Sequence, residues 1–169
     1  MTAPPTFSDG VVVHATDLNF LLNPPACMVQ QNTAQAAIPA STYTPITFDA
    51  ESYDPYNLHS TSTNTSRVNI GLVLGWWHVS GCVSWATNAT GNTRRCILGI
   101  NGTFVNGSQI LVSPAPQIVS APLPGIFVQS TVNTDYIELQ GWHDATASVA
   151  TLVSGTYRSY LAARYLAAA

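Results

Sequence analysis

Residues 68–85 read VNIGLVLGWWHVSGCVSW, and this stretch decides the fold class. From Trp77 to Trp85, large or apolar residues alternate with His, Ser and Cys, a period of two that is typical of a half-buried β-strand. Glycines at positions 71, 75 and 81 would each destabilise a helix by about 1 kcal/mol. The sequence therefore predicts a central strand that is entered through a turn or bulge at Gly75.

Short segments on both sides of this strand predict further strands. They are separated by Gly-, Asn- and Pro-rich turns at intervals of about 8–12 residues, a spacing that favours a β-sandwich or barrel. The last segment, 157–166, is compatible with a helix by composition, but its alternation favours a strand. The other expected strands span residues 27–30, 42–48, 67–70, 94–101, 109–113, 118–121, 125–132 and 136–143.

Residues 1–40 differ from the rest of the chain and predict an arm in front of a β-domain at 41–169. A short helix is expected to begin at Ala15 or Thr16 and to end at Leu22, because Asn-Pro-Pro follows. Since so short an apolar helix is unstable alone, it must dock on the β-domain or on another protein. The arm's candidate anchoring residues are Phe7, Val12, Leu18, Phe20, Leu21 and Leu22.

The composition is poor in charge. Charged residues make up 8% of the chain, against about 25% in a typical domain, and every cation is an arginine. Nucleic acid is an improbable partner, because binding to phosphates needs clustered Lys and Arg. A surface covered by protein partners suits this composition, and a monomer with a neutral Ser/Thr surface is the alternative.

No targeting or membrane segment is recognisable in the sequence. The first residues lack a basic start followed by an apolar core, and no apolar run reaches the length of about 18 residues that a span needs. We therefore expect synthesis in a cytoplasm, no membrane contact, and cysteines that stay reduced. Cys82 and Cys96 either bridge a hairpin or are two small core residues, and a reducing compartment favours the second interpretation.

The chemistry-bearing residues form no recognisable active site. The four histidines lie far apart in the sequence, without the spacing of a zinc site or a catalytic motif. Asp49, Glu51 and Asp54 either bind calcium or hold a turn through hydrogen bonds, and the turn is favoured. We therefore predict no catalytic, cofactor or metal site and no enzymatic activity.

Several phrases, taken in order, resemble one family. The domain at 41–169 is similar to the C1q/TNF-like jelly rolls, although Thr134 stands where that family usually has glycine and no collagen-like stalk is present. The phrases are ITFD at 46–49, YD at 53–54, LGWWHVSG at 74–81, ILGING at 97–102, TDYIEL at 134–139 and SYL at 159–161.

The arm carries a second resemblance. The phrase FSDGVVV at 7–13, followed by DLN at 17–19, is similar to the opening of many virion proteins of tailed bacteriophages. Arm and jelly roll together imply a phage structural protein that is assembled in the bacterial cytoplasm and ends in the virion.

The C1q/TNF-like resemblance implies a homotrimer. Arg158 and Arg164 would then pair across subunits with Glu138 or Asp135, and aromatic side chains would line the interface. The alternative is that these aromatics fill the subunit's own core. The candidate interface residues are Trp142, Tyr157, Arg158, Tyr160, Arg164 and Tyr165.

The expected role is therefore trimeric decoration of a phage head, with the arm bound to the major capsid protein or another virion protein. The alternative is a tail-tip or fibre module whose loops at 57–66, 88–93 and 142–148 bind a glycan on the host surface. A jelly-roll hydrolase is disfavoured, because the sequence offers no acid pair or nucleophile.

Overall fold

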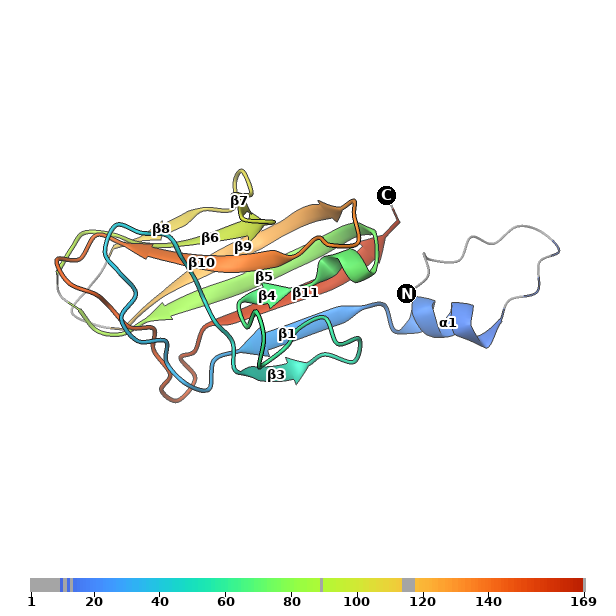
Figure 1. Ribbon diagram of the computed structural model, residues 1–169, viewed down its shortest axis with the longest axis horizontal. Coiled ribbons are helices and arrows are strands. Elements are labelled where there is room, and N and C mark those ends of the chain that lie inside the picture. Colours follow the sequence, from blue (N-terminus) through green and yellow to red (C-terminus); the bar gives the residue numbers. More distant parts are fainter. Residues whose placement is uncertain (1–9, 11, 13, 89, 114–117, 169) are drawn as a thin grey trace.

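The computed structural model describes residues 10, 12, 14–88, 90–113 and 118–168. In this part of the chain, two antiparallel sheets stack as a β-sandwich, and one helix extends from an end of it (Figure 1). The all-β sandwich expected from the sequence is confirmed. The helix is α1 (Ala15–Leu22), as the sequence predicted.

The first sheet, here called the β5 sheet, contains the central strand. Its strand order is β3-β1-β11-β5-β9, so β5 lies between the C-terminal strand and a long edge strand. The members are β1 (Ala26–Gln30), β3 (Ala50–Tyr53), β5 (Gly75–Trp85), β9 (Val119–Ser130) and β11 (Tyr160–Ala167).

The second sheet, here called the β10 sheet, has the order β2-β10-β6-β7, with β4 paired to β10 and β8 paired to β6. A single turn of 3-10 helix, η1 (Ile70–Leu72), leads from β4 into β5. The members are β2 (Thr44–Pro45), β4 (Arg67–Val68), β6 (Arg94–Ile100), β7 (Thr103–Phe104), β8 (Ile110–Val112) and β10 (Ile137–His143).

The core lies between the sheets, and β5 supplies its largest side chains. Trp77, Val79, Val83 and Trp85 are fully buried, which is the inner face predicted from the alternation. Gly75 enters the strand at φ 139°, a conformation that favours glycine. The neighbouring strand β11 has a register shift at this point, so the predicted irregularity is present.

The proline-containing segment differs from the prediction. Residues 118–121 and 125–132 were expected to be two strands, but Val119–Ser130 is one strand that pairs along β5. Pro122 and Pro124 are tolerated there because β9 is the edge of the sheet, where one side needs no partner for its N–H groups.

The N-terminal segment enters the sandwich earlier than residue 40. β1 pairs with β11 over its full length, and Ile38 exchanges backbone hydrogen bonds with Val149. Residues 26–40 therefore pack with the β-domain, and α1 is the described part of the arm that lies outside the two sheets. The C-terminal segment is itself the strand β11, which pairs with β1, so the helical alternative for this segment is wrong.

All three cysteines are buried free thiols, so Cys82 and Cys96 are not bridged. Burial raises the pKa of the Cys82 thiol, which keeps it protonated. None of the helices in the described ranges is long and apolar enough to cross a membrane.

One carboxylate organises the loop between β9 and β10. Asp135 accepts hydrogen bonds from the backbone N–H groups of Thr131 and Val132, from the amide of Asn101 and from the hydroxyl of Ser130. Burial opposes the charge of Asp135, but these hydrogen bonds outweigh burial and lower its pKa. The loop is therefore held by an ionised carboxylate.

We predict that Asp135→Asn lowers the free energy of unfolding by about 1–3 kcal/mol near neutral pH, because donors are left unpaired. The contribution of the ionised group is complete above the unfolded pKa of about 3.9 and is lost as the pH falls through the lower folded pKa. Urea unfolding of both proteins at about pH 7 and about pH 2.5 should show the difference shrinking in acid. An equal difference at both pH values would show that the charge is irrelevant.

Candidate interaction surface

The outer face of the β5 sheet is the candidate functional surface. Its side chains come from the outward positions of all five strands, which the pairing register aligns into rows. We call it the apolar face, and its larger members are Met28, Tyr53, Trp76, His78, Phe127, Tyr160, Arg164 and Leu166.

One row crosses the middle of the apolar face. His78 pairs with Arg164 on one side and with Phe127 on the other. The rings of His78 and Phe127 lie 5.5 Å apart, and Phe127 still leaves 62% of its surface exposed. Arg164 is the single arginine of this row, so the row exposes mainly aromatic and aliphatic surface with little charge.

His78 and Arg164 of this row also line a shallow groove of about 320 Å³. Its other lining residues include Met28, Tyr53 and the smaller Ala26, Ser80 and Ala162, which the register places on adjacent strands. The apolar face therefore carries an exposed ring toward one edge and a groove toward the other.

The predicted interface residues divide between several places. Tyr160 and Arg164 lie on the apolar face. Trp142 lies on β10, in the other sheet, where the guanidinium of Arg95 stacks 4.1 Å from its ring. Tyr157 and Arg158 lie in the turn before β11, and Arg158 donates to Asn32 at 2.8 Å.

The assignment of Tyr165 to an interface is wrong. Tyr165 is 3% exposed, and its ring packs edge-on against Trp77 and Phe20 at 5.5 and 5.6 Å. It shares the inward phase of β11 with Leu161 and Ala163, so for this tyrosine the core alternative holds.

The expected ion pairs between subunits are not available either. Glu138 accepts from the guanidinium of Arg67 at 3.4 Å and from the hydroxyl of Ser66 at 2.7 Å. The carboxylate of Asp135 already accepts hydrogen bonds from Thr131 and Val132 in the loop between β9 and β10. Both carboxylates therefore have partners within the subunit, which leaves Arg158 and Arg164 without the predicted ones.

Sequence reasoning missed Met28, Tyr53, Trp76 and Phe127 as surface residues. The available signal was the alternation of β5, which places Trp76 in the same phase as His78. The neighbours of His78 on other strands depend on register between distant segments, which the sequence pattern does not contain.

Contacts at Phe20 and Asn23 anchor the arm to its own subunit. Phe20 packs on Tyr165, so it is not a free anchoring residue as predicted. The hydroxyls of Tyr53 and Tyr56 donate to the side-chain and backbone oxygens of Asn23 at 3.0 and 2.6 Å.

The other predicted anchoring residues of the arm are exposed to solvent where the structure describes them. Val12, Leu18, Leu21 and Leu22 are exposed, whereas Phe7 lies outside the described residues. The arm therefore presents an apolar helix surface while Phe20 holds that helix in place.

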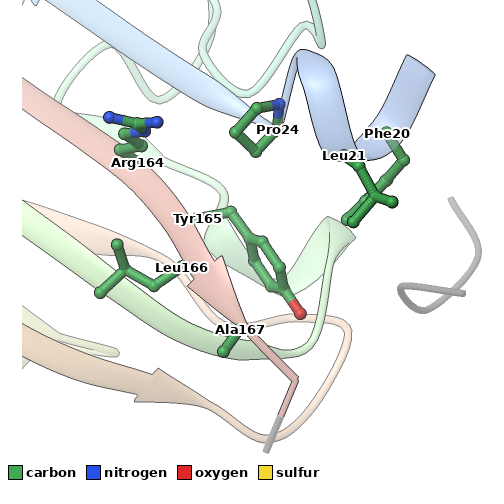
Figure 2. Close-up of a pocket in the computed structure, with 7 residues that line it drawn as sticks. All are labelled: Phe20, Leu21, Pro24, Arg164, Tyr165, Leu166 and Ala167. Atoms are coloured by element: carbon green, nitrogen blue, oxygen red, sulfur yellow. The ribbon is translucent and has the colours of Figure 1, made fainter. Parts of the chain in front are cut away.

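Figure 2 shows a cleft between α1 and the end of β11. It has a volume of about 250 Å³ and is lined by Phe20, Leu21, Pro24 and the last residues of β11. The hydroxyl of Tyr165 is buried and has no hydrogen-bond partner in the described part of the chain. Burial raises the pKa of this phenol, so the hydroxyl keeps its proton.

The acidic cluster has structural roles. Asp49 accepts from the backbone of Asn32, Asp54 accepts from the N–H groups of Leu58 and His59, and Glu51 contacts the ring of His59 at 3.0 Å. The prediction of a turn held by hydrogen bonds is confirmed for Asp54. In the described ranges, no group of three or more His, Cys, Asp or Glu is placed to hold a metal ion.

Two of the three loops proposed for glycan binding are held by hydrogen bonds within the subunit. Arg94 donates to the carbonyls of Asn88 and Thr90, and Asp144 accepts from Asn92 and Thr93. His143, in the third loop, is fully buried. Residues 61–64 remain exposed.

The fold resembles solved structures of the tumour necrosis factor type. Murine APRIL matches with a TM-score of 0.60 and 9% identity over 83% of this chain and 98% of that one. Eiger TNF from S. frugiperda matches with a TM-score of 0.57 and 16% identity over 86% and 95%. No protein-family model and no curated protein matches the chain. The chain thus has a TNF/C1q-like jelly-roll fold.

Two tyrosines assigned to one interface should respond differently to truncation. Tyr165→Ala is expected to lower the free energy of unfolding by about 3–5 kcal/mol, because it removes a buried ring that packs against Trp77 and Phe20. Tyr157→Ala, at a residue that is 46% exposed, should change it by no more than about 0.5 kcal/mol. Denaturant unfolding measures both values, and similar losses would refute the assignment of Tyr165 to the core.

Proposed function

We propose that the chain is a non-enzymatic structural protein that forms a homotrimer and decorates the head of a tailed bacteriophage. The observation that carries the proposal is the apolar face of the β5 sheet. A monomer that exposed this face would leave a contiguous aromatic and aliphatic patch in water, which is typical of a protein interface.

The two features of the apolar face support assembly of identical copies. Phe127 projects near the β9 edge, and the groove lies toward β1 and β3. A projecting ring and a groove on one molecule allow a head-to-tail contact, which closes into a ring when the rotation permits; a twofold dimer is the competing arrangement, and the mass of the assembly distinguishes the two. Phe127 of one copy then fills the groove of the next copy, and three copies complete the ring.

The virion role rests on the arm. Its opening phrase at 7–13 is similar to that of phage virion proteins, and α1 presents exposed leucines from a fixed position. An arm that binds the assembled shell, and not the free coat protein, stabilises the shell by mass action. The partner is the major capsid protein or another virion protein.

A tail-tip or fibre module that binds host glycans remains the alternative function. The hydrogen bonds that join the loops at 88–93 and 142–148 to each other and to Ile38 favour the decoration role, because these polar groups are already engaged. The copy number of the chain in purified particles separates the two roles. Decoration requires many copies over the head, and a tail tip requires few.

We expect Phe127→Asn to convert the trimer into monomers without unfolding the subunit, because the exposed ring contributes to the contact and hardly to the core. Leu111→Asn is the matched control, since Leu111 is similarly exposed (54%) but lies on β8 in the other sheet. Light scattering coupled to size-exclusion chromatography gives the mass. A wild-type monomer, or a trimer that survives Phe127→Asn, would contradict the proposed interface.

The arm is tested by replacing Leu18, Leu21 and Leu22 together with serine. The variant should remain a folded trimer, because these side chains are exposed, but should no longer co-sediment with particles of the phage that encodes it. Leu111→Ser serves as control for a general loss of surface apolarity. Undiminished sedimentation of the triple variant with heads would disprove the anchoring role.

A further inference from the structure

The cleft of Figure 2 forms where the arm leaves the sheet. β1 and β11 pair as far as Ala26 and Arg164, and the N–H of Tyr165 donates to the carbonyl of Pro25 at 2.8 Å. The residues before Pro24 form α1 and not a continuation of β1. On this side the end of β11 therefore lies beside the helix, while its other side stays paired with β5. The hydrogen bonds to Asn23 fix this geometry, so the cleft is built by the fold.

Two polar groups at this cleft have no partner among the residues that the structure describes. The hydroxyl of Tyr165 is buried and unpaired, a costly state for a polar atom. Arg164 also lines the cleft, and its guanidinium makes no hydrogen bond or ion pair to any residue that the structure describes. Phenylalanine at position 165 would keep the ring contacts with Trp77 and Phe20 without the unpaired hydroxyl.

Arg164 is exceptional among the cations of this chain. Arg67 pairs with Glu138, Arg95 stacks on Trp142, Arg158 donates to Asn32, and Arg94 donates to carbonyls beside Asp144. A guanidinium left free next to an apolar cleft is therefore a feature of this site alone in the described chain.

The guanidinium of Arg164 is exposed to solvent and therefore open to a carboxylate from outside the subunit. The described carboxylates of a second copy are poor candidates, because each already has a partner in its own subunit; Asp9 and Asp17 lie outside the described side chains. The described carboxylates are Asp49, Glu51, Asp54, Asp135, Glu138 and Asp144. Among the described residues this favours another protein as the source of the carboxylate.

We propose that this cleft binds a peptide segment of another protein in which an apolar side chain lies next to a carboxylate. The apolar side chain packs against Phe20 and Leu21, the carboxylate meets the guanidinium of Arg164, and the Tyr165 hydroxyl donates to an oxygen of the segment. Leu21 and Leu166 extend the contact at the rim, since both are exposed. The inference needs neither the trimer nor the virion location.

The test uses N-acetyl-phenylalanine, which carries the free carboxylate, and N-acetyl-phenylalaninamide, which lacks it. Both are titrated into the full-length protein, and NMR follows the amides of Leu166 and Ala167 and the side-chain N–H of Arg164. We expect binding in the millimolar range, with the acid about fivefold tighter than the amide, as suits one partly exposed ion pair.

Three variants separate the contributions. Arg164→Gln should abolish the preference for the acid but leave binding of the amide, and Arg158→Gln, at the arginine already bonded to Asn32, should change neither. Tyr165→Phe keeps the ring and should weaken both probes severalfold, while its unfolding midpoint stays unchanged or rises. A hydroxyl with only a structural role would leave both affinities unaltered.

The outcomes decide the proposal independently of the phage role. Failure of both probes to shift the cleft resonances, or shifts confined to other surfaces, overturns it. Equal affinity for acid and amide overturns the assignment of Arg164. The oligomeric state of Phe127→Asn says nothing about whether the probes bind the cleft. Failure of the cleft proposal and failure of the proposed function can therefore be told apart.

Discussion

The pairing of β5 between β11 and β9 is the constraint on which the structure depends. Its inward residues, Trp77, Val79, Val83 and Trp85, are fully buried and fill much of the space between the sheets. A shift of one residue would turn these side chains outward and bury His78 and Ser80 instead. The core therefore fixes the register, and the same register aligns Arg164, His78 and Phe127 on the outside. The apolar face is a geometric consequence of the core.

The sequence predicted the local parts of this arrangement well. The alternation of β5, the short helix before Pro24 and the strand character of β11 are all set by neighbours within a few residues. The prolines misled the prediction at β9, because their effect depends on whether a strand lies at an edge. Edge position is a property of the sheet, which the order of residues within one strand does not specify.

The predicted interface was less successful for a related reason. Alternation puts Tyr160 and Tyr165 on opposite faces of the C-terminal strand, so the two could not both belong to one exposed face, and the prediction grouped them by residue type alone. Trp142 was grouped with β11 by residue type, although it lies in the other sheet. Phe127 was overlooked, because its position beside His78 follows from pairing between distant segments. Surface composition was predictable from the sequence, whereas the arrangement of that surface required the fold.

The scarcity of charge gives each ionised group a defined task. The described carboxylates close loops or hold single side chains, as Asp54, Asp135 and Asp144 do. Such a surface can recognise partners mainly by shape and by a few hydrogen bonds, because no broad electrostatic field is available. Arg164 and Leu166 at the end of β11 belong both to the apolar face and to the cleft beside the arm. A partner bound on the apolar face and a segment bound in the cleft would both meet the guanidinium of Arg164, so the two proposed contacts would influence each other if both were made in one assembly, although each can be tested alone.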